Sequence, residues 1–248
     1  MTKAWFETWF DAPYYPMLYK HRDHEEAALF LNRLLEKLSL TPPATMLDVA
    51  CGRGRHAVYL HQKGFTVTGF DLSEVSIQEA RKQEARGLHF EVRDMRQPFT
   101  HPQWDLVLNL FTSFGYFDAD ADSFRAMQAM ASAVLPGGSL VLDYLEPGSV
   151  QVAPSLAEAL PEEYTTEGVT FVIRKYREGG FVYKDIFVED GAAMYTFQEK
   201  VRLFEKGDLL HMAERCGLEP MAVFGDYALS PWTAGCPRQI HWFKKSAL

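Results

Sequence analysis

Cysteine is scarce in this sequence, and its pattern argues against two common structural devices. The 248 residues include three cysteines, Cys51, Cys216 and Cys236. An odd count without any C-x-x-C pair disfavours both a disulfide framework and a thiolate zinc site. We therefore expect reduced thiols, as is typical of a cytoplasmic protein.

Long apolar runs and an excess of basic residues are also missing. No apolar run approaches the roughly 20 residues needed to cross a bilayer, and we expect no signal peptide because the first residues lack its basic and apolar segments. Basic residues are outnumbered by acidic ones. Lysine and arginine number 25 against 33 acidic residues, so the formal charge is −8. Nucleic-acid binding relies on clustered basic residues, and this acidic balance therefore disfavours DNA or RNA as a partner. We expect a cytoplasmic protein that is a monomer or a homodimer.

The sequence does contain a regular alternation of apolar runs and helical patterns. Helical spacing is expected over residues 24–38, 55–62, 74–87, 122–135 and 208–217. Strand-like runs are expected at residues 44–50, 65–71, 88–94, 104–111, 139–145, 220–227 and 238–245. Strands that alternate with helices predict right-handed crossovers. The expected fold class is α/β, a doubly wound, Rossmann-like and mostly parallel seven-stranded sheet.

A different pattern follows residue 145. Two strand-like runs flank Glu178-Gly179-Gly180, which is a hairpin signal, and a third run follows at residues 193–204. They predict a small antiparallel β insertion. The expected organisation is a helical, aromatic lid segment at 1–44, a Rossmann-like core at 45–145, the insertion as a substrate lid at 146–200, and the completion of the core at 201–248.

The stretch LDVACGRGRHAVYL, which begins at Leu47, places Gly52 and Gly54 between a buried strand and a helix. Ligands of open α/β sheets bind beyond the carboxyl ends of the strands, and glycine lets a ligand approach the backbone closely. Asp71 ends the next strand, where a carboxylate can accept hydrogen bonds from ribose hydroxyls. The turn therefore predicts a site for a nucleotide-like cofactor.

Two cofactors compete for this turn. Residues 52–57 match G-x-G-x-x-A, an accepted dinucleotide fingerprint, which leaves an NAD(P)-dependent oxidoreductase open. Asp48 argues against it, because a carboxylate beside a pyrophosphate is repulsive, and no hydride-transfer machinery follows. S-adenosylmethionine, which carries a sulfonium and an ammonium, suits the same carboxylate. A non-catalytic cofactor-binding module on this fold is a third possibility.

Over residues 45–145 the chain resembles the class I S-adenosylmethionine-dependent methyltransferases of the small-molecule type. The resemblance rests on LDVACGRGRHAVYL, VTGFDLS, EVRDMRQ, WDLVLNLFTSFGYF and LPGGSLVLDYL, in this order. It implies methyl transfer from S-adenosylmethionine to a small-molecule acceptor by in-line displacement. Ala50 stands where the family more often has glycine, so we expect altered spacing there rather than lost binding.

The resemblance also implies roles for individual residues. Those expected to bind the cofactor are Asp48, Ala50, Gly52 and Gly54 around the methionine portion, Asp71 at the ribose, Leu72, Asp94 and Met95 at the adenine, Asn109, Leu110 and Phe111 beside the sulfonium, and Tyr19 and Arg22 at the methionine carboxylate. Alternatives stay open: Asp94 can pair with Arg93 or Arg96 instead, and the aromatic amino-terminal segment can be a packing element rather than a lid.

The catalytic group is unknown, and its candidates are Tyr116, Tyr144 and His211. The methyl donor is already activated, so alignment and exclusion of water are the main tasks of the protein. An apolar acceptor pocket is expected from Phe114, Tyr116, Phe117 and Tyr144.

No metal site is expected. His21 and His24 are close in the sequence, but no third ligand is placed beside them.

Overall fold

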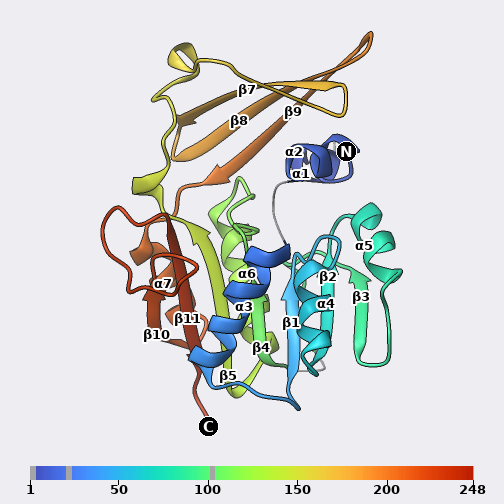
Figure 1. Ribbon diagram of the computed structural model, residues 1–248. Helices are drawn as coiled ribbons and strands as arrows, with labels where there is room; N and C mark the ends of the chain where they lie inside the picture. Colours follow the sequence, from blue (N-terminus) through green and yellow to red (C-terminus); the bar gives the residue numbers. More distant parts are fainter. Residues whose placement is uncertain (1–3, 21–23, 101–103, 248) are drawn as a thin grey trace. The chain divides into compact units, whose positions relative to one another are not determined.

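The computed structural model describes residues 4–20, 24–100 and 104–247, which form two compact units (Figure 1). The parallel-sheet unit contains the described residues of 24–114, 118–150 and 204–247. The antiparallel unit contains the described residues of 4–20, 115–117 and 151–203. The two units are described separately below.

The parallel-sheet unit contains a seven-stranded sheet in the order β10-β11-β5-β4-β1-β2-β3. Strands β1 to β5 run parallel to one another, whereas β10 and β11 are antiparallel. The strands are β1 Thr45–Val49, β2 Thr66–Asp71, β3 Leu88–Val92, β4 Trp104–Asn109, β5 Val134–Leu145, β10 Leu218–Phe224 and β11 Arg238–Lys245. This arrangement confirms the predicted doubly wound, mostly parallel sheet.

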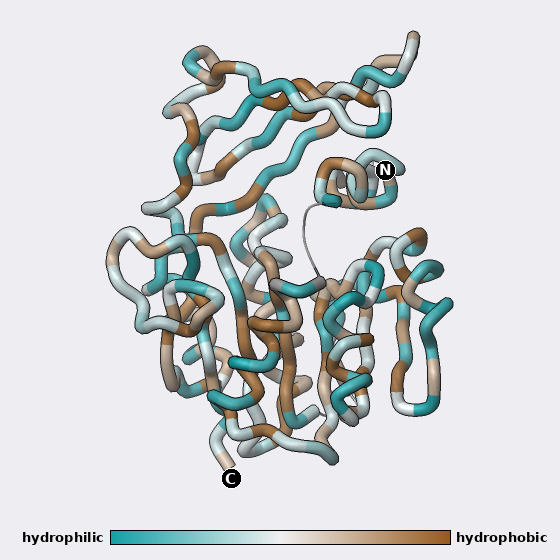
Figure 2. Tube along the Cα trace, viewed as in Figure 1, coloured by the Kyte–Doolittle hydropathy of each residue, from teal (hydrophilic) through white to brown (hydrophobic). Residues whose placement is uncertain are grey.

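Five helices cover this sheet, and they divide between its two faces. One buried cluster combines side chains of α3, α4 and α5 with Met46, Leu106 and Val141 of the strands. Helices α6 and α7 contact each other and the strands β4, β5 and β10. The helices are α3 His24–Leu38, α4 Arg55–Gln62, α5 Glu74–Arg81, α6 Asp120–Ala133 and α7 Lys206–Arg215. Figure 2 shows the central strands as the most hydrophobic segments, because both of their faces are buried.

The antiparallel unit is a four-stranded sheet in the order β6-β7-β8-β9, with two short helices packed on one face. Trp9, Tyr14 and Leu18 of these helices share a buried cluster with Phe171 and Ile186 of the sheet. The predicted hairpin joins β7 to β8. The elements are β6 Glu162–Thr166, β7 Val169–Glu178, β8 Phe181–Asp190, β9 Ala193–Arg202, α1 Trp5–Trp9 and α2 Tyr14–Leu18, with a single 3-10 turn, Leu156–Glu158, before β6. Another 3-10 turn, Pro147–Ser149, follows β5 in the parallel-sheet unit.

Several predicted boundaries are wrong. The helix after Ser73 ends at Arg81 rather than at Gly87. The N–H groups of residues 82–84 donate to carbonyls three positions earlier instead of four, and Ala85 then forms an antiparallel bridge with Leu88. Strand β5 begins at Val134 rather than at 139, because the segment predicted as a turn pairs irregularly with β4. The helix expected at 122–135 therefore ends earlier, at Ala133. Strand β6 was missed because its side chains are exposed.

The division into units differs from the four segments expected from the sequence. Residues 4–20 belong with 115–117 and the antiparallel sheet, whereas helix α3 belongs with the parallel sheet. None of the described helices is long and apolar enough to cross a bilayer.

Candidate functional site

The turn after β1 is built from left-handed backbone. Ala50, Gly52 and Gly54 have φ values of 58°, 55° and 81°. Glycine adopts this region freely, whereas alanine costs roughly 1–2 kcal/mol there. A Cβ on Gly54 would lie 2.6 Å from the ring of Phe90, but one on Gly52 would meet no atom within 4 Å. Gly54 is therefore required by packing, and Gly52 leaves the backbone open to a ligand.

Asp71, the last residue of β2, ties this turn to the next crossover. Its Oδ2 accepts the backbone N–H of Gly52 at 2.9 Å, and its Oδ1 accepts that of Ser73 at 2.9 Å. Ser73 in turn caps α5, since its Oγ accepts the Ser76 N–H at 3.0 Å. These bonds fix the carboxylate at the carboxyl edge of the sheet, where it was expected.

Asp48 is a buried acid at the same edge, with 1% of its surface exposed. Burial is the main cause that raises the pKa of Asp48 to about 7, and the Asp71 carboxylate adds to it. A hydrogen bond from the backbone of Ala57, at the start of α4, and the charge of Arg55 act in the opposite direction. Asp48 Oδ2 has no hydrogen-bond partner among the described residues. Such an oxygen favours a nearby cation or donor.

The segment after β4 meets the turn at the switch point of the sheet, between β1 and β4. Asn109 is fully buried, and its Nδ2 donates to the carbonyl of Val49 at 3.1 Å. Phe111 stacks on the ring of His56, with 5.0 Å between centroids, and the guanidinium of Arg55 lies 4.9 Å from the same centroid. The predicted turn and the predicted post-β4 residues are therefore brought together.

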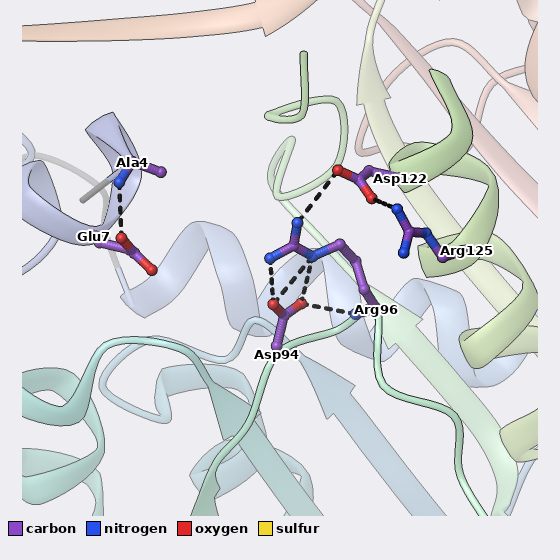
Figure 3. Close-up of polar contacts among 6 residues, drawn as sticks. All are labelled: Ala4, Glu7, Asp94, Arg96, Asp122 and Arg125. Atoms are coloured by element: carbon purple, nitrogen blue, oxygen red, sulfur yellow. Dashed lines mark hydrogen bonds and ion pairs between the residues drawn. The ribbon is translucent and has the colours of Figure 1, made fainter. Parts of the chain in front are cut away.

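The loop after β3 carries a compact ion-pair cluster (Figure 3). Arg96 donates from Nε to both oxygens of Asp94 at 3.0 Å and reaches Asp122 at 3.3 Å, and Asp122 also pairs with Arg125. Burial alone would raise the pKa of Asp94, but the hydrogen bonds and charge of Arg96 outweigh it and lower that pKa. The alternative pairing of Asp94 with Arg96 is thus present. An adenine contact of Asp94 and Met95 stays a prediction.

These residues fit a ligand that carries both cationic groups and a ribose. Asp48 has an oxygen without a partner, Asp71 is held in place by backbone donors, and the space above Gly52 is open. Two carboxylates at this edge attract a cation and repel a pyrophosphate.

Comparison with known proteins agrees with this chemistry. Residues 46–138 match the model of the methyltransferase domain family. This part of the chain is therefore a methyltransferase domain. Two similar solved structures, those of CalS10 and of the glycopeptide N-methyltransferase MtfA, contain bound S-adenosylmethionine.

The similarity to individual methyltransferases extends over most of the chain. The methyltransferase YqeM of Bacillus subtilis is 26% identical over 84% of this chain and 87% of its own length. Cypemycin N-terminal methyltransferase of a Streptomyces species is 26% identical over 77% of this chain and 78% of its own. Among solved structures, CalS10, an amino pentose methyltransferase from Micromonospora echinaspora, superposes with a TM-score of 0.71 at 24% identity, covering 95% of this chain and 98% of that one.

The remaining cofactor candidates are Leu72, Leu110, Tyr19 and Arg22. Leu72 and Leu110 flank the site residues in the chain, the first half-buried and the second buried. Tyr19 belongs to the antiparallel unit, where its hydroxyl donates to Glu199 at 2.6 Å and accepts from Lys184 at 2.7 Å. Arg22 lies outside the described residues, as does His21. No cluster of three His, Cys, Asp or Glu suited to a metal ion occurs in the described part of the chain.

The three catalytic candidates of this methyltransferase are not brought together by either unit. Tyr116 packs against Trp5 within the antiparallel unit, with 5.1 Å between ring centroids. Tyr144 is fully buried in the parallel-sheet unit beside Phe114. His211 is exposed on α7. Their roles stay predictions.

Sequence reasoning missed a second polar cluster at the carboxyl edge, formed by Asp143, Tyr227 and Arg238. Asp143 lies within the apolar run LVLDYL, and an acid inside such a run is a signal that the sequence did offer. Its partners follow more than 80 residues later, and no spacing rule connects them. His56 was also missed, since the turn motif does not specify its residue type.

Proposed function

We propose that this methyltransferase transfers a methyl group from S-adenosylmethionine to a small-molecule acceptor by in-line displacement. The observation that carries the proposal is the meeting of the left-handed turn, Asp48 and Asp71 at the carboxyl edge of the sheet. S-adenosylmethionine supplies an electrophilic methyl group on a sulfonium. The protein therefore needs to align the acceptor and keep water away rather than to provide a nucleophile.

Each side chain of the site has a task in this proposal. Asp71, whose carboxylate is oriented by the amides of Gly52 and Ser73, binds the ribose. Asp48 and the open backbone at Gly52 bind the methionine portion, and Asn109 to Phe111 line the sulfonium end. Leu72, Asp94 and Met95 bind the adenine. Support for these tasks comes from the positions of the four strand ends in one parallel sheet.

The acceptor is proposed to carry an amino group. Two similar proteins are an N-terminal methyltransferase and an amino pentose methyltransferase. An amine becomes a nucleophile once it loses its proton, and a group that accepts this proton assists the reaction. The acceptors to screen first are amino sugars and short peptides.

The antiparallel unit is proposed to recognise the acceptor, as a lid. Its support is an aromatic cluster in which the ring of Tyr116 contacts the rings of Trp5, Phe6 and Phe10 at centroid distances of 5.1, 6.5 and 5.6 Å. Large aromatic surfaces of this kind bind the apolar parts of small ligands.

Calorimetric titration with S-adenosylhomocysteine, NADH and NADPH tests the cofactor assignment. We expect only S-adenosylhomocysteine to bind, with a micromolar dissociation constant, and Asp71→Ala to lower its affinity at least 100-fold. Asp105→Ala is the matched control, because Asp105 also accepts a backbone N–H, that of Thr45 at 2.7 Å, but at the amino-terminal end of β4. Binding of a nicotinamide nucleotide instead would contradict the proposal.

The acceptor is tested separately. The protein is incubated with S-adenosylmethionine carrying a labelled methyl group and with each candidate, and labelled product is separated by chromatography. Methylation of an amine supports the proposal, whereas methylation of hydroxyl or thiol acceptors alone would overturn its amine part.

A further inference from the structure

Asp143 is a fully buried carboxylate near the carboxyl end of β5. Its Oδ1 accepts from Arg238, with 2.8 Å to Nε and 2.6 Å to Nη2. Its Oδ2 accepts the backbone N–H of Phe111 at 2.8 Å and the hydroxyl of Tyr227 at 3.1 Å. A buried charge is tolerated when it is paired and hydrogen-bonded in this way.

The cluster holds the two residues after Leu110 in an unusual backbone conformation. Phe111 and Thr112 have φ values of 57° and 60°, a region that residues other than glycine rarely adopt. Besides the Phe111 bond, the Thr112 N–H donates to the carbonyl of Asp143 at 3.0 Å, and Arg238 Nη2 donates to Thr112 Oγ1 at 2.8 Å. Such a conformation persists when the surroundings determine it fully, and here three hydrogen bonds do so.

The same cluster supports the ring of Phe111. Tyr227 packs against this ring, with 5.1 Å between centroids, and the Arg238 guanidinium lies 5.5 Å from the Tyr227 ring. Phe111 also contacts the start of α4, through His56 and Arg55. The ring therefore joins the cofactor turn to the cluster.

We propose that Asp143 and Arg238 are positioning residues for the donor site: they fix Phe111 and Thr112 in the conformation that lines the sulfonium end of S-adenosylmethionine. This inference rests on the proposed function, because it takes the post-β4 segment as the place of the sulfonium. The two residues act through the backbone and ring of Phe111. Their loss affects the end of the cofactor that carries the methyl group more than its nucleoside.

The test compares the dissociation constants of S-adenosylmethionine and S-adenosylhomocysteine, which differ only in the methyl group and the sulfonium charge. Both oxygens of Asp143 accept hydrogen bonds. In Asp143→Asn an NH2 group replaces one of these oxygens, and in either orientation of the amide this group faces a hydrogen-bond donor. We expect the affinity for S-adenosylmethionine to fall at least fivefold more than that for S-adenosylhomocysteine. The amides of Phe111 and Thr112 should also exchange faster.

Two further variants separate positioning from stability. Tyr227→Phe removes one hydrogen bond to Asp143 and keeps the ring, so a smaller shift in the same direction is expected even if Asp143→Asn does not fold. Glu146→Gln is the matched control: Glu146 is also buried, directly after the same strand, and accepts from Trp232 Nε1 at 2.8 Å. We expect this control to leave the affinity ratio unchanged.

An unchanged ratio in both Asp143→Asn and Tyr227→Phe, or an equal shift in Glu146→Gln, would overturn the inference. A distinct outcome is that the unaltered protein binds neither S-adenosylmethionine nor S-adenosylhomocysteine. It would overturn the proposed function, and the inference with it.

Discussion

Asp71 Oδ2 accepts the backbone N–H of Gly52, with 2.9 Å between oxygen and nitrogen. The bond joins the end of β2 to the turn after β1 and so helps to fix the shape of the turn. A preformed site loses less conformational freedom on binding. Asp71 therefore both shapes the site and binds in it, which is why the Asp71→Ala test needs the Asp105→Ala control for stability.

The two glycines of the turn should respond differently to alanine. In Gly54→Ala the new Cβ meets the Phe90 ring in a left-handed backbone, so we expect a loss of at least about 2 kcal/mol in the free energy of unfolding. Gly52→Ala meets no atom and should cost only about 1 kcal/mol, but weaken S-adenosylhomocysteine binding at least tenfold. Denaturant unfolding and calorimetry measure both effects. Equal stability losses in the two variants would contradict the packing argument.

Asp48 should make stability depend on pH. Burial, with Asp71 adding to it, raises its pKa in the folded protein to about 7, against about 3.9 in the unfolded chain. Between these values the folded state binds more protons, so the free energy of unfolding falls as the pH rises from about 4 to about 7, by up to about 4 kcal/mol. Asp48→Asn should lose this dependence, as measured by denaturant unfolding at pH 4.5 to 8. A difference between the two proteins that stays constant over this range would refute the assignment.

Glu199 should anchor the amino-terminal helices within the antiparallel unit. It accepts from Trp9 Nε1 at 2.7 Å and from the Tyr19 hydroxyl at 2.6 Å. Glu199→Ala removes both bonds, so we expect about 2–4 kcal/mol less protection of the amides of α1 and α2 against hydrogen exchange. Glu167→Ala, which removes the exposed pair with Lys20, should change this protection little. The prediction fails if both variants lose the same protection.

Arg96 should control the ionisation of Asp94. Arg96→Met leaves Asp94 partly buried without its counter-charge, so its pKa should rise from its lowered position towards and above the ordinary value. The loss in stability is expected to be about 1 kcal/mol, since the pair is partly exposed. Carboxyl NMR titration follows the pKa. Arg125→Met, on the exposed side of the cluster, should raise the pKa of Asp94 much less, because the charge of Arg125 is the smallest of the causes that lower it.

The alternation of strands and helices could be predicted because buried parallel strands leave a pattern that depends on nearby residues. Ser73 is an example, since an N-cap contacts the amide three residues later. The end of the following helix at Arg81 could not be predicted, because residues 82–88 fold back through turns and a pairing between Ala85 and Leu88. Local signals place an element, whereas its last turn depends on what it meets.

The sequence alone determined the turn, its two glycines and the acid at the end of β2, because glycine conformation and strand ends are local properties. The tertiary structure decided which of the polar groups at the site have hydrogen-bond partners. Only the fold shows that Asp71 is bonded to Gly52, that Asp48 keeps a buried oxygen without a partner in the described residues, and that Asp143 meets Arg238. Burial and pairing depend on residues far apart in the chain, and they set the charge of a carboxylate and the shape of a loop.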